Sequence, residues 1–302
     1  MTDPAGLSRR DLGEAVMGAA LGIGGMLAPH AARASTEPDR VAGMSLADRV
    51  RAFMKAQASL NEEKVIWRTR GVIMAYVPGR TPEPMLRFKG CEQQWVKPIS
   101  DTKFVRYNSL INFMCDYETD EIISEFKNPF TGKTNKVSHY VSRVPEGMEI
   151  SEEGVFINIV RQAYPEFYQD STFDMDIAVI EDEMSFRGEV KWPAELRQPP
   201  SGSMQSFFSR YSEVMDPKTS WAHCHFAGHV LMNWYPWMEM PDQPGHMLWH
   251  ATGYKVRSWD SLPKDYLAKA TKDYAEIFDK SPEFDPGPSA MAKRLKASGR
   301  LP

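Results

Sequence analysis

A proline-rich turn at residues 78–84 (PGRTPEP) most constrains the fold, because no helix can run through its three prolines. β-branched and aromatic residues fill the flanking segments 65–77 and 85–96, which we predict to be strands. Residues 104–115 alternate polar and apolar side chains, as a half-buried strand does. Strands joined in sequence order by short turns predict an antiparallel meander.

Further strands are predicted at residues 122–126, 136–144, 155–160, 173–180 and 184–192 and within 221–238 and 246–256, with a loop at 146–154. Residues 207–215 fit the period of a helix as well as that of a strand, and we favour the strand. A sheet of so many twisted strands tends to curl and close, since closure removes its edges. We therefore predict a mainly β fold, with a single large antiparallel barrel or strongly curved, lipocalin-like sheet. An N-terminal helix capped by Ser45 and a C-terminal helix after Pro263 flank the sheet, and a mobile tail follows from Ser281.

The first 34 residues have the pattern of an export signal. Residues 8–12 (SRRDL) form a twin-arginine motif, an apolar run follows at 15–27, and residues 32–34 (ARA) form a cleavage site before Ser35. We predict a twin-arginine signal at 1–34, recognised by the twin-arginine export machinery, and one β-barrel-like domain with flanking helices at 35–302. The protein would then be periplasmic or secreted. An uncleaved anchor or a mobile N-terminal helix is the alternative.

Composition excludes several classes of partner. The net charge of −4 gives no basic excess for nucleic acid, and no apolar stretch in 35–302 is long enough for stable membrane insertion. The sequence motifs of common hydrolases, metalloproteases, nucleotide-binding proteins and thiol oxidoreductases are missing. The three cysteines form no disulfide framework; Cys91 and Cys115 could pair across neighbouring strands, or all three thiols could be free. The oligomeric state is not set by these features.

Histidines concentrate in one segment, because five of the seven lie between residues 223 and 250. On an extended strand His223, His225 and His229 have the same parity, so their imidazoles would point to one face. Such a trio suits acid/base catalysis near neutral pH, with His225 and His229 acting and His223 supporting them. The same trio could instead hold zinc or iron, or could form a polar strand face without chemistry.

Candidate ligand-binding residues lie in two places. Three aromatic residues that follow the histidines could stack on an aromatic ligand, although such residues more often belong to a core; these are Trp234, Tyr235 and Trp237. The segment 104–115 contains Tyr107 and also a polar row of Arg106, Asn108 and Asn112. In a barrel this row could line a cavity, with Tyr107 and Asn108 as pocket residues, but a solvated outer face is the favoured interpretation of the row.

Several motifs together resemble the domain-of-unknown-function family 1838. They are the proline turn after Val77, the run from Asp116 to Ile123 that leads into residues 128–132 (NPFTG), the segment 236–238 (PWM), Pro244-Gly245 and residues 259–263 (WDSLP). The resemblance covers nearly all of 35–302 and implies a β-rich protein, in a family many of whose members carry twin-arginine signals. It implies no reaction and no catalytic residues.

Together these features predict an exported enzyme that acts on a hydrophobic, aromatic or polycyclic small molecule in a barrel pocket. Acid/base chemistry without a cofactor points to a lyase, hydratase, isomerase or hydrolase that uses the three histidines. The five pocket residues named above would bind the substrate. A non-catalytic, lipocalin-like carrier of the same kind of ligand is the first alternative. A metalloenzyme that holds zinc or iron through the three histidines is the second.

Overall fold

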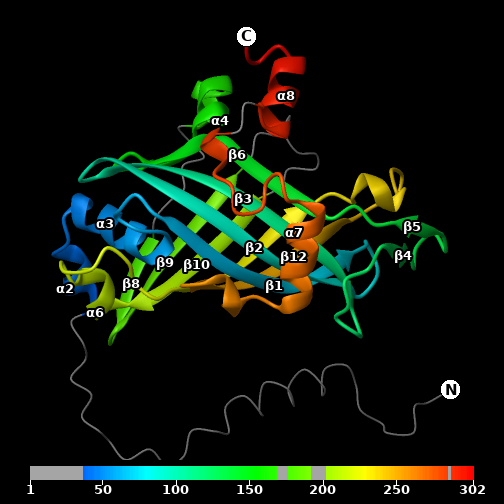
Figure 1. Cartoon of the computed structure of the whole chain (residues 1–302), viewed down its shortest axis with the longest axis horizontal. Coiled ribbons are helices and arrows are strands. Elements are labelled where there is room, and N and C mark those ends of the chain that lie inside the picture. The colour runs from blue at the N-terminus through cyan, green and yellow to red at the C-terminus, as the bar shows by residue number, and fades with distance from the viewer. Residues whose placement is uncertain (1–36, 169–175, 192–201, 285–286) are drawn as a thin grey trace, which may run out of the picture. The chain divides into compact units, whose positions relative to one another are not determined.

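The computed structural model describes residues 37–168, 176–191, 202–284 and 287–302. Within these residues the strands form one ten-stranded antiparallel sheet, curled into a half-barrel, and a separate two-stranded hairpin (Figure 1). This confirms the predicted mainly β fold with one large, strongly curved antiparallel sheet. The sheet contains β1 (Lys64–Tyr76), β2 (Glu83–Ser100), β3 (Lys103–Asp116), β6 (Tyr140–Ser151), β7 (Gly154–Ile157), β8 (Asp176–Ile180), β9 (Glu183–Lys191), β10 (Gly202–Arg210), β11 (His225–Met232) and β12 (His246–Val256).

The strand order is that of an antiparallel meander in which the first strand, β1, pairs with the last, β12, and the sheet is open between β7 and β8. Across the sheet the order is β7-β6-β3-β2-β1-β12-β11-β10-β9-β8. Apart from the inserted hairpin, each neighbouring pair follows in the chain except β1 and β12, which pair from Ile66↔Val256 to Tyr76↔His246. β7 and β8 are consecutive strands, yet they form the two edges. The chain therefore enters the sheet at its middle, runs out to one edge, and returns from the other.

The hairpin between β3 and β6 consists of β4 (Glu125–Lys127) and β5 (Thr134–Lys136). Asn128, at the start of the predicted turn, holds it in place. Its Oδ1 accepts a hydrogen bond from the backbone N–H of Phe130 at 2.9 Å, which forms the local turn. Its Nδ2 donates to the Met238 carbonyl at 3.1 Å, which fastens the hairpin to the segment after β11.

Several boundaries differ from the sequence prediction. The strand predicted at 155–160 ends at Ile157, where helix α4 (Asn158–Ala163) begins, the segment predicted as a strand at 136–144 is divided between β5 and β6, and the strand predicted at 122–126 forms as β4 at 125–127. β6 continues through residues 146–151, where the sequence predicts a loop, because a bulge opposite Arg106 and Asn108 accommodates Gly147, whose φ is +78°. β10 ends at Arg210 and the short helix α6 (Tyr211–Met215) follows, so the strand predicted at 207–215 forms only in its first part. The predicted mobile tail contains helix α8 (Ala290–Ala297), which buries Leu295.

Helix α3 (Leu46–Gln57) confirms the predicted N-terminal helix. Ser45 caps it in a capping box, since its side chain accepts from the Asp48 N–H while the Asp48 carboxylate accepts from the Ser45 N–H. Its buried residue Phe53 packs edge-on against Phe186 and Phe207 of the sheet, at ring centroid distances of 5.7 and 6.0 Å. The helix thus packs its apolar stripe on one end of the half-barrel.

Helix α7 (Lys264–Asp273) confirms the predicted C-terminal helix and packs against β3. Tyr266 is fully buried, and its hydroxyl donates to the Ile111 carbonyl at 3.1 Å. Its ring lies 5.0 Å from that of Phe113. The remaining helical segments are α2 (Glu37–Ala42), α4 (Asn158–Ala163), α5 (Pro165–Tyr168), η1 (Pro236–Met238), η2 (Trp259–Ser261) and η3 (Pro282–Phe284).

All three cysteines are buried free thiols. Cys91 and Cys115 do lie on neighbouring strands, but Cys91 is opposite Ile111 and Cys115 opposite Arg87, so the register keeps them apart. This overturns the possible disulfide and supports the alternative of free thiols. The residues of the signal predicted at 1–34 lie outside the described part of the chain. No helix among the described residues has both the length and the apolar character needed to span a membrane.

Candidate ligand-binding cavity

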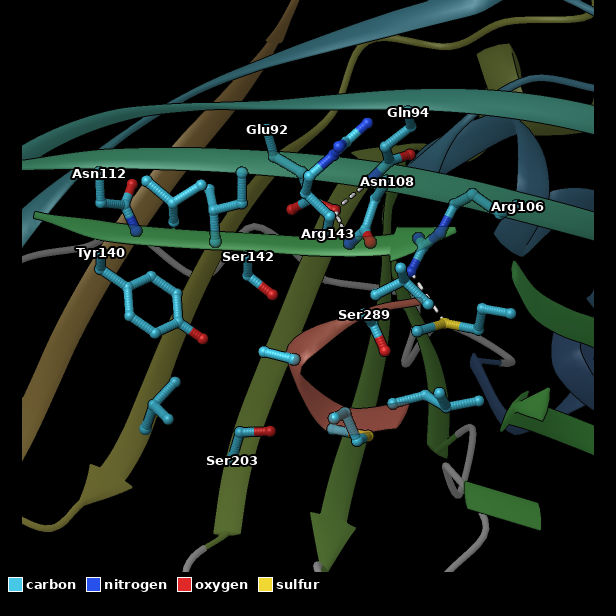
Figure 2. Close-up of a pocket in the computed structure, with 18 of the residues that line it drawn as sticks. Glu92, Gln94, Arg106, Asn108, Asn112, Tyr140, Ser142, Arg143, Ser203 and Ser289 are labelled. Carbon is cyan, nitrogen blue, oxygen red and sulfur yellow. Dashed lines mark hydrogen bonds between the residues drawn. The ribbon is translucent and has the colours of Figure 1, made fainter. Parts of the chain in front are cut away.

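The inner face of the curled sheet borders a cavity of about 950 Å³ (Figure 2). Strands β1, β2, β3, β6, β10, β11 and β12 contribute side chains to its lining, and residues 287–291 with the start of α8 lie along it. We call the lined surface the inner face and the opposite surface of the sheet the outer face. Pockets of roughly 300–1,000 Å³ enclose most of a drug-sized molecule, so this cavity is large enough for one.

An aromatic wall forms one part of the lining. Trp67 of β1 lies edge-on to Phe207 of β10 and to Phe226 of β11, with centroids 5.8 and 5.5 Å apart. Further along, the ring of Trp249 lies 4.4 Å from that of Phe88. Each of these residues comes from a different strand, and all of them line the cavity, so they lie on the inner face. The wall offers flat apolar surface to a hydrophobic ligand.

A polar group on β2 and β3 borders this wall, because Glu92 of β2 is directly opposite Trp67 of β1 in the ladder. It consists of Glu92, Gln94, Arg106 and Asn108, which Figure 2 shows gathered on one side of the cavity, with Ser203 of β10 on the other. Gln94 is directly opposite Asn108 in the ladder. Glu92 Oε1 accepts from Gln94 Nε2 at 3.1 Å and from Asn108 Nδ2 at 3.0 Å. The carboxylate and both amides are therefore fixed relative to one another.

Arg106 is the least satisfied member of this group. Its residue is 5% exposed, and its Nη2 donates to the Met148 sulfur at 3.0 Å, a weak acceptor. Its Nε and Nη1 have no hydrogen-bond partner, and neither do Gln94 Oε1 and Asn108 Oδ1. Burial lowers the pKa of Arg106, and the charge of Glu92 opposes that effect. A buried cation with free donors is costly unless something pairs with it, so Arg106 is the strongest candidate in the lining for pairing with an anionic group.

A glycine makes room for the neighbouring part of the polar row. A Cβ on Gly90 would lie 1.7 Å from Asn112 Oδ1 and 2.6 Å from Thr69 Oγ1. In the native chain Thr69 donates to that same Asn112 oxygen at 3.2 Å, so both side chains occupy the space above the glycine. Gly90 thus allows a buried polar bridge between β1 and β3 across β2.

The predicted catalytic histidines lie away from the cavity. β11 begins only at His225, so His223 precedes the strand; its exposed ring lies 3.1 Å from a carboxylate oxygen of Glu213. His225 is exposed and stacks on Phe208 at 5.0 Å. His229 Nε2 lies 2.7 Å from His250 Nδ1, and burial, followed by the His250 charge, lowers the pKa of His229.

His225 and His229 share one face, as their parity predicts, but it is the outer face, because Phe226 and Val230 between and beside them line the cavity. No histidine belongs to the cavity lining formed by the described residues. Nor does any group of three histidine, cysteine or acidic side chains in that part of the chain have the arrangement of metal ligands. The catalytic and metal-binding roles of the three histidines stay predictions.

Of the five predicted pocket residues, only Asn108 lines the cavity. Tyr107 lies on the outer face, where burial, followed by the charge of Glu283, raises its pKa. The other three belong to an apolar cluster beneath the β4–β5 hairpin. There Trp234 donates to the Gln243 carbonyl at 2.9 Å, and Tyr235 stacks on Trp237 at 5.7 Å. The same cluster includes residues that line the cavity, among them Phe88, Tyr140 and Trp249, and the ring of Trp249 lies 6.3 Å from that of Tyr235.

The polar row of Arg106, Asn108 and Asn112 lies on the inner face, which corrects the favoured interpretation of a solvated surface. Its parity was readable from sequence, but the covering of the opposite face by α7 was not. Glu92 and Gln94 were missed because the segment 92–94 (EQQ) places polar residues on both faces of β2, which hides the alternation. A charged side chain in register with a polar row is the signal that could have revealed them.

Comparisons with known proteins identify the family of the chain but no function. The family model described as "Protein of unknown function (DUF1838)" matches residues 62–295. No curated protein matches the chain. A lipovitellin structure, solved for its lipid–protein interactions, has 7% identity and a TM-score of 0.28, over 65% of this chain and 25% of that one. Ail, the attachment invasion locus protein of Yersinia pestis, has 7% identity and a TM-score of 0.15, over 65% of this chain and 100% of that one. Likenesses this weak carry no argument.

Proposed function

Because the chain belongs to the DUF1838 family of proteins of unknown function, we propose its function from the cavity: the protein binds a hydrophobic small molecule, aromatic or polycyclic, on the inner face of its sheet. The observation that carries this proposal is the cavity of about 950 Å³, whose lining combines an aromatic wall with an adjoining polar group. Apolar pockets with a few convergent polar groups are the usual form of small-molecule sites.

The aromatic wall and the polar group would contribute to ligand binding in different ways. The wall around Trp67, Phe207 and Phe226 removes apolar ligand surface from water, which stabilises the complex by about 25 cal/mol per Å². The unpartnered amide oxygens of Gln94 and Asn108, with the Arg106 donors, would orient the polar end of the ligand. A bound molecule would thus lie across the cavity with its apolar body against β1, β10 and β11.

The test is a fluorescence titration with 1-pyrenebutanol, an uncharged polycyclic probe. Wild-type protein should bind it, and Val230→Trp should weaken binding at least about tenfold, because an indole at this lining position occupies the cavity. Leu231→Trp is the matched control: it adds the same side chain at the next residue of β11, which does not line the cavity, and should leave binding unchanged.

Two results would contradict the binding proposal. One is wild-type protein that does not bind the probe; the other is equal weakening by the two tryptophan variants, which would place the probe elsewhere on the protein. Replacing both His225 and His229 with Ala should not change the affinity, because neither residue lines the cavity. Circular dichroism of each variant would show that its fold is intact.

Conversion of the bound molecule is the second candidate function, and Glu92 is the observation that favours it. Its carboxylate lies in the cavity, is held by two amides and could act as a general acid or base, a role for which the histidines lie on the wrong face. Compounds that raise the melting temperature would be incubated with the protein and analysed by mass spectrometry. Glu92→Gln should keep binding and abolish any conversion. If wild-type protein converts none of the compounds it binds, the carrier is the better description.

The place of action is a separate proposal. We infer twin-arginine export to the periplasm or medium from the sequence motifs in 1–34 alone, and cleavage before Ser35 would leave the whole cavity in the exported protein. N-terminal sequencing of protein recovered from a bacterial periplasm tests it; an intact residue 1 on that protein would contradict cleavage.

A further inference from the structure

We infer that the ligand of the cavity is an organic acid, whose carboxylate pairs with Arg106 while its hydrophobic body lies on the aromatic wall. This inference rests on the proposed binding function and narrows it to a chemical class. It follows from the state of one side chain, which the structure shows buried, charged and incompletely paired.

Arg106 has no strong hydrogen-bond acceptor among the described residues. Nε and Nη1 have no partner, and the sulfur of Met148 is the acceptor of Nη2. A guanidinium presents its N–H groups in a rigid plane that matches the two oxygens of a carboxylate. Neutral acceptors such as alcohols or ethers can take one of these donors, but they leave the charge uncompensated.

No carboxylate of the described chain already serves as the partner. Glu92 is the acidic residue whose charge acts on Arg106, but its Oε1 accepts from Gln94 and Asn108, and the two side chains do not form an ion pair. The desolvation of Arg106 outweighs the attraction of Glu92, because the net effect is a lowered pKa. With Glu92 held by Gln94 and Asn108, and with Arg106 Nε and Nη1 without a partner, the positive charge of Arg106 is incompletely compensated within the described chain.

Basic residues outnumber acidic ones around the cavity. Its lining contains four basic residues, Arg106, Arg143, Lys293 and Arg294, and two acidic ones, Glu92 and Glu146. Glu146 Oε1 accepts from the backbone N–H of Ser289 at 2.9 Å, beside the start of α8. A low-dielectric cavity with net positive lining attracts anions and repels cations.

The experiment compares three probes that share one polycyclic body and differ only in the head group: 1-pyrenebutanoate, 1-pyrenebutanol and 1-pyrenebutylamine. Wild-type protein should bind the acid at least about tenfold more tightly than the alcohol, the ratio expected of one charge-assisted hydrogen bond, and the amine most weakly. Arg106→Met should bring the affinity for the acid down to about that for the alcohol, whose own affinity should fall much less because it loses at most one neutral hydrogen bond. Arg106→Lys, which keeps the charge, should retain part of the preference.

Arg70→Met is the matched control, because it removes an exposed positive charge of β1 that lies outside the cavity lining and leaves Arg106 in place. It should keep most of the preference for the acid. Equal binding of acid and alcohol by the wild type, tighter binding of the amine, or a preference that survives Arg106→Met would each overturn the inference.

These outcomes are separate from the failure of the proposed function, in which wild-type protein binds none of the three probes. Binding of the alcohol by Arg106→Met reports that this variant is folded. If that variant does not fold, the head-group ranking of the wild type and of Arg106→Lys still decides the question.

Discussion

His139 is a histidine that the fold keeps neutral. Its Nδ1 accepts a hydrogen bond from the Met114 N–H at 3.2 Å, and its ring meets the edge of Phe113 at 5.0 Å. Burial, with the charge of Lys269 as second cause and against the opposing effect of Asp273, lowers the pKa of His139 to about 4. Protonation of Nδ1 would replace its lone pair with a proton and break the bond from Met114.

This predicts a pH dependence of stability. Between about pH 6.5 and 4 the unfolded chain binds a proton at this residue while the folded protein does not, so the free energy of unfolding falls as the pH falls through that range. In His139→Asn, which keeps an acceptor but does not titrate, the fall should be smaller. Urea unfolding of both proteins at pH 7, 6 and 5 measures the difference. Parallel pH profiles would contradict the assignment.

At the residue scale the sequence predicted which side chains share a face of a strand. It did not predict whether that face is the inner or the outer face of the sheet. Parity grouped Arg106, Asn108 and Asn112 correctly, and it also grouped His225 with His229. The deciding information is what covers each surface of the sheet, and this depends on α7, which lies about 150 residues further along the chain than β3. No local pattern contains that information.

At the scale of elements, a buried lysine connects α3 to the sheet. Lys255 of β12 is 4% exposed, and its Nζ donates to the carbonyls of Lys55 at 2.6 Å and Ala58 at 3.0 Å, at the C-terminal end of the helix. The same nitrogen lies 4.3 Å from the centre of the Trp221 ring. The last carbonyls of a helix need such donors, because no further turn supplies them.

Lys255→Met should therefore destabilise the protein by about 1–3 kcal/mol, the usual cost of leaving buried acceptors without a donor. Lys272→Met is the control, since it removes an exposed lysine of α7 and should change stability by less than about 0.5 kcal/mol. Urea unfolding compares the two. Unchanged or increased stability of Lys255→Met would show that the desolvation of the buried amine outweighs its two hydrogen bonds.

Helices and strands were predicted correctly where clear turn or cap residues mark their ends. The prediction was wrong where a turn-like sequence lies inside a strand. Strand β12 agrees with its prediction at 246–256, and the predicted cap at Ser45 marks the start of α3. Residues 145–147 (PEG) look like a turn but form the bulge of β6, because pairing with β3 continues on both sides of it. Tertiary pairing overrides a local turn preference there.

At the scale of the molecule, the meander and its curvature followed from the succession of short turns, while the pairing of β1 with β12 did not. The two strands are separated by most of the domain, and nothing in either segment names the other as its partner. The cavity depends on that pairing, since β1, β2 and β3 supply Trp67 and the polar group while β10, β11 and β12 supply Phe207, Phe226 and Trp249.

The same pairing bears on how the chain must be made. During synthesis β1 leaves the ribosome early and, once β2 has joined one side, its other side stays unpaired until β12 emerges. At about 5–20 residues per second, the 180 residues between Tyr76 and Val256 take roughly 10–35 s. For that time a thirteen-residue strand destined for the centre of the sheet is an open edge that another nascent chain can join. The half-barrel is thus exposed to misassembly until translation of its last strand, and codon choice or chaperone binding over that interval would decide its yield.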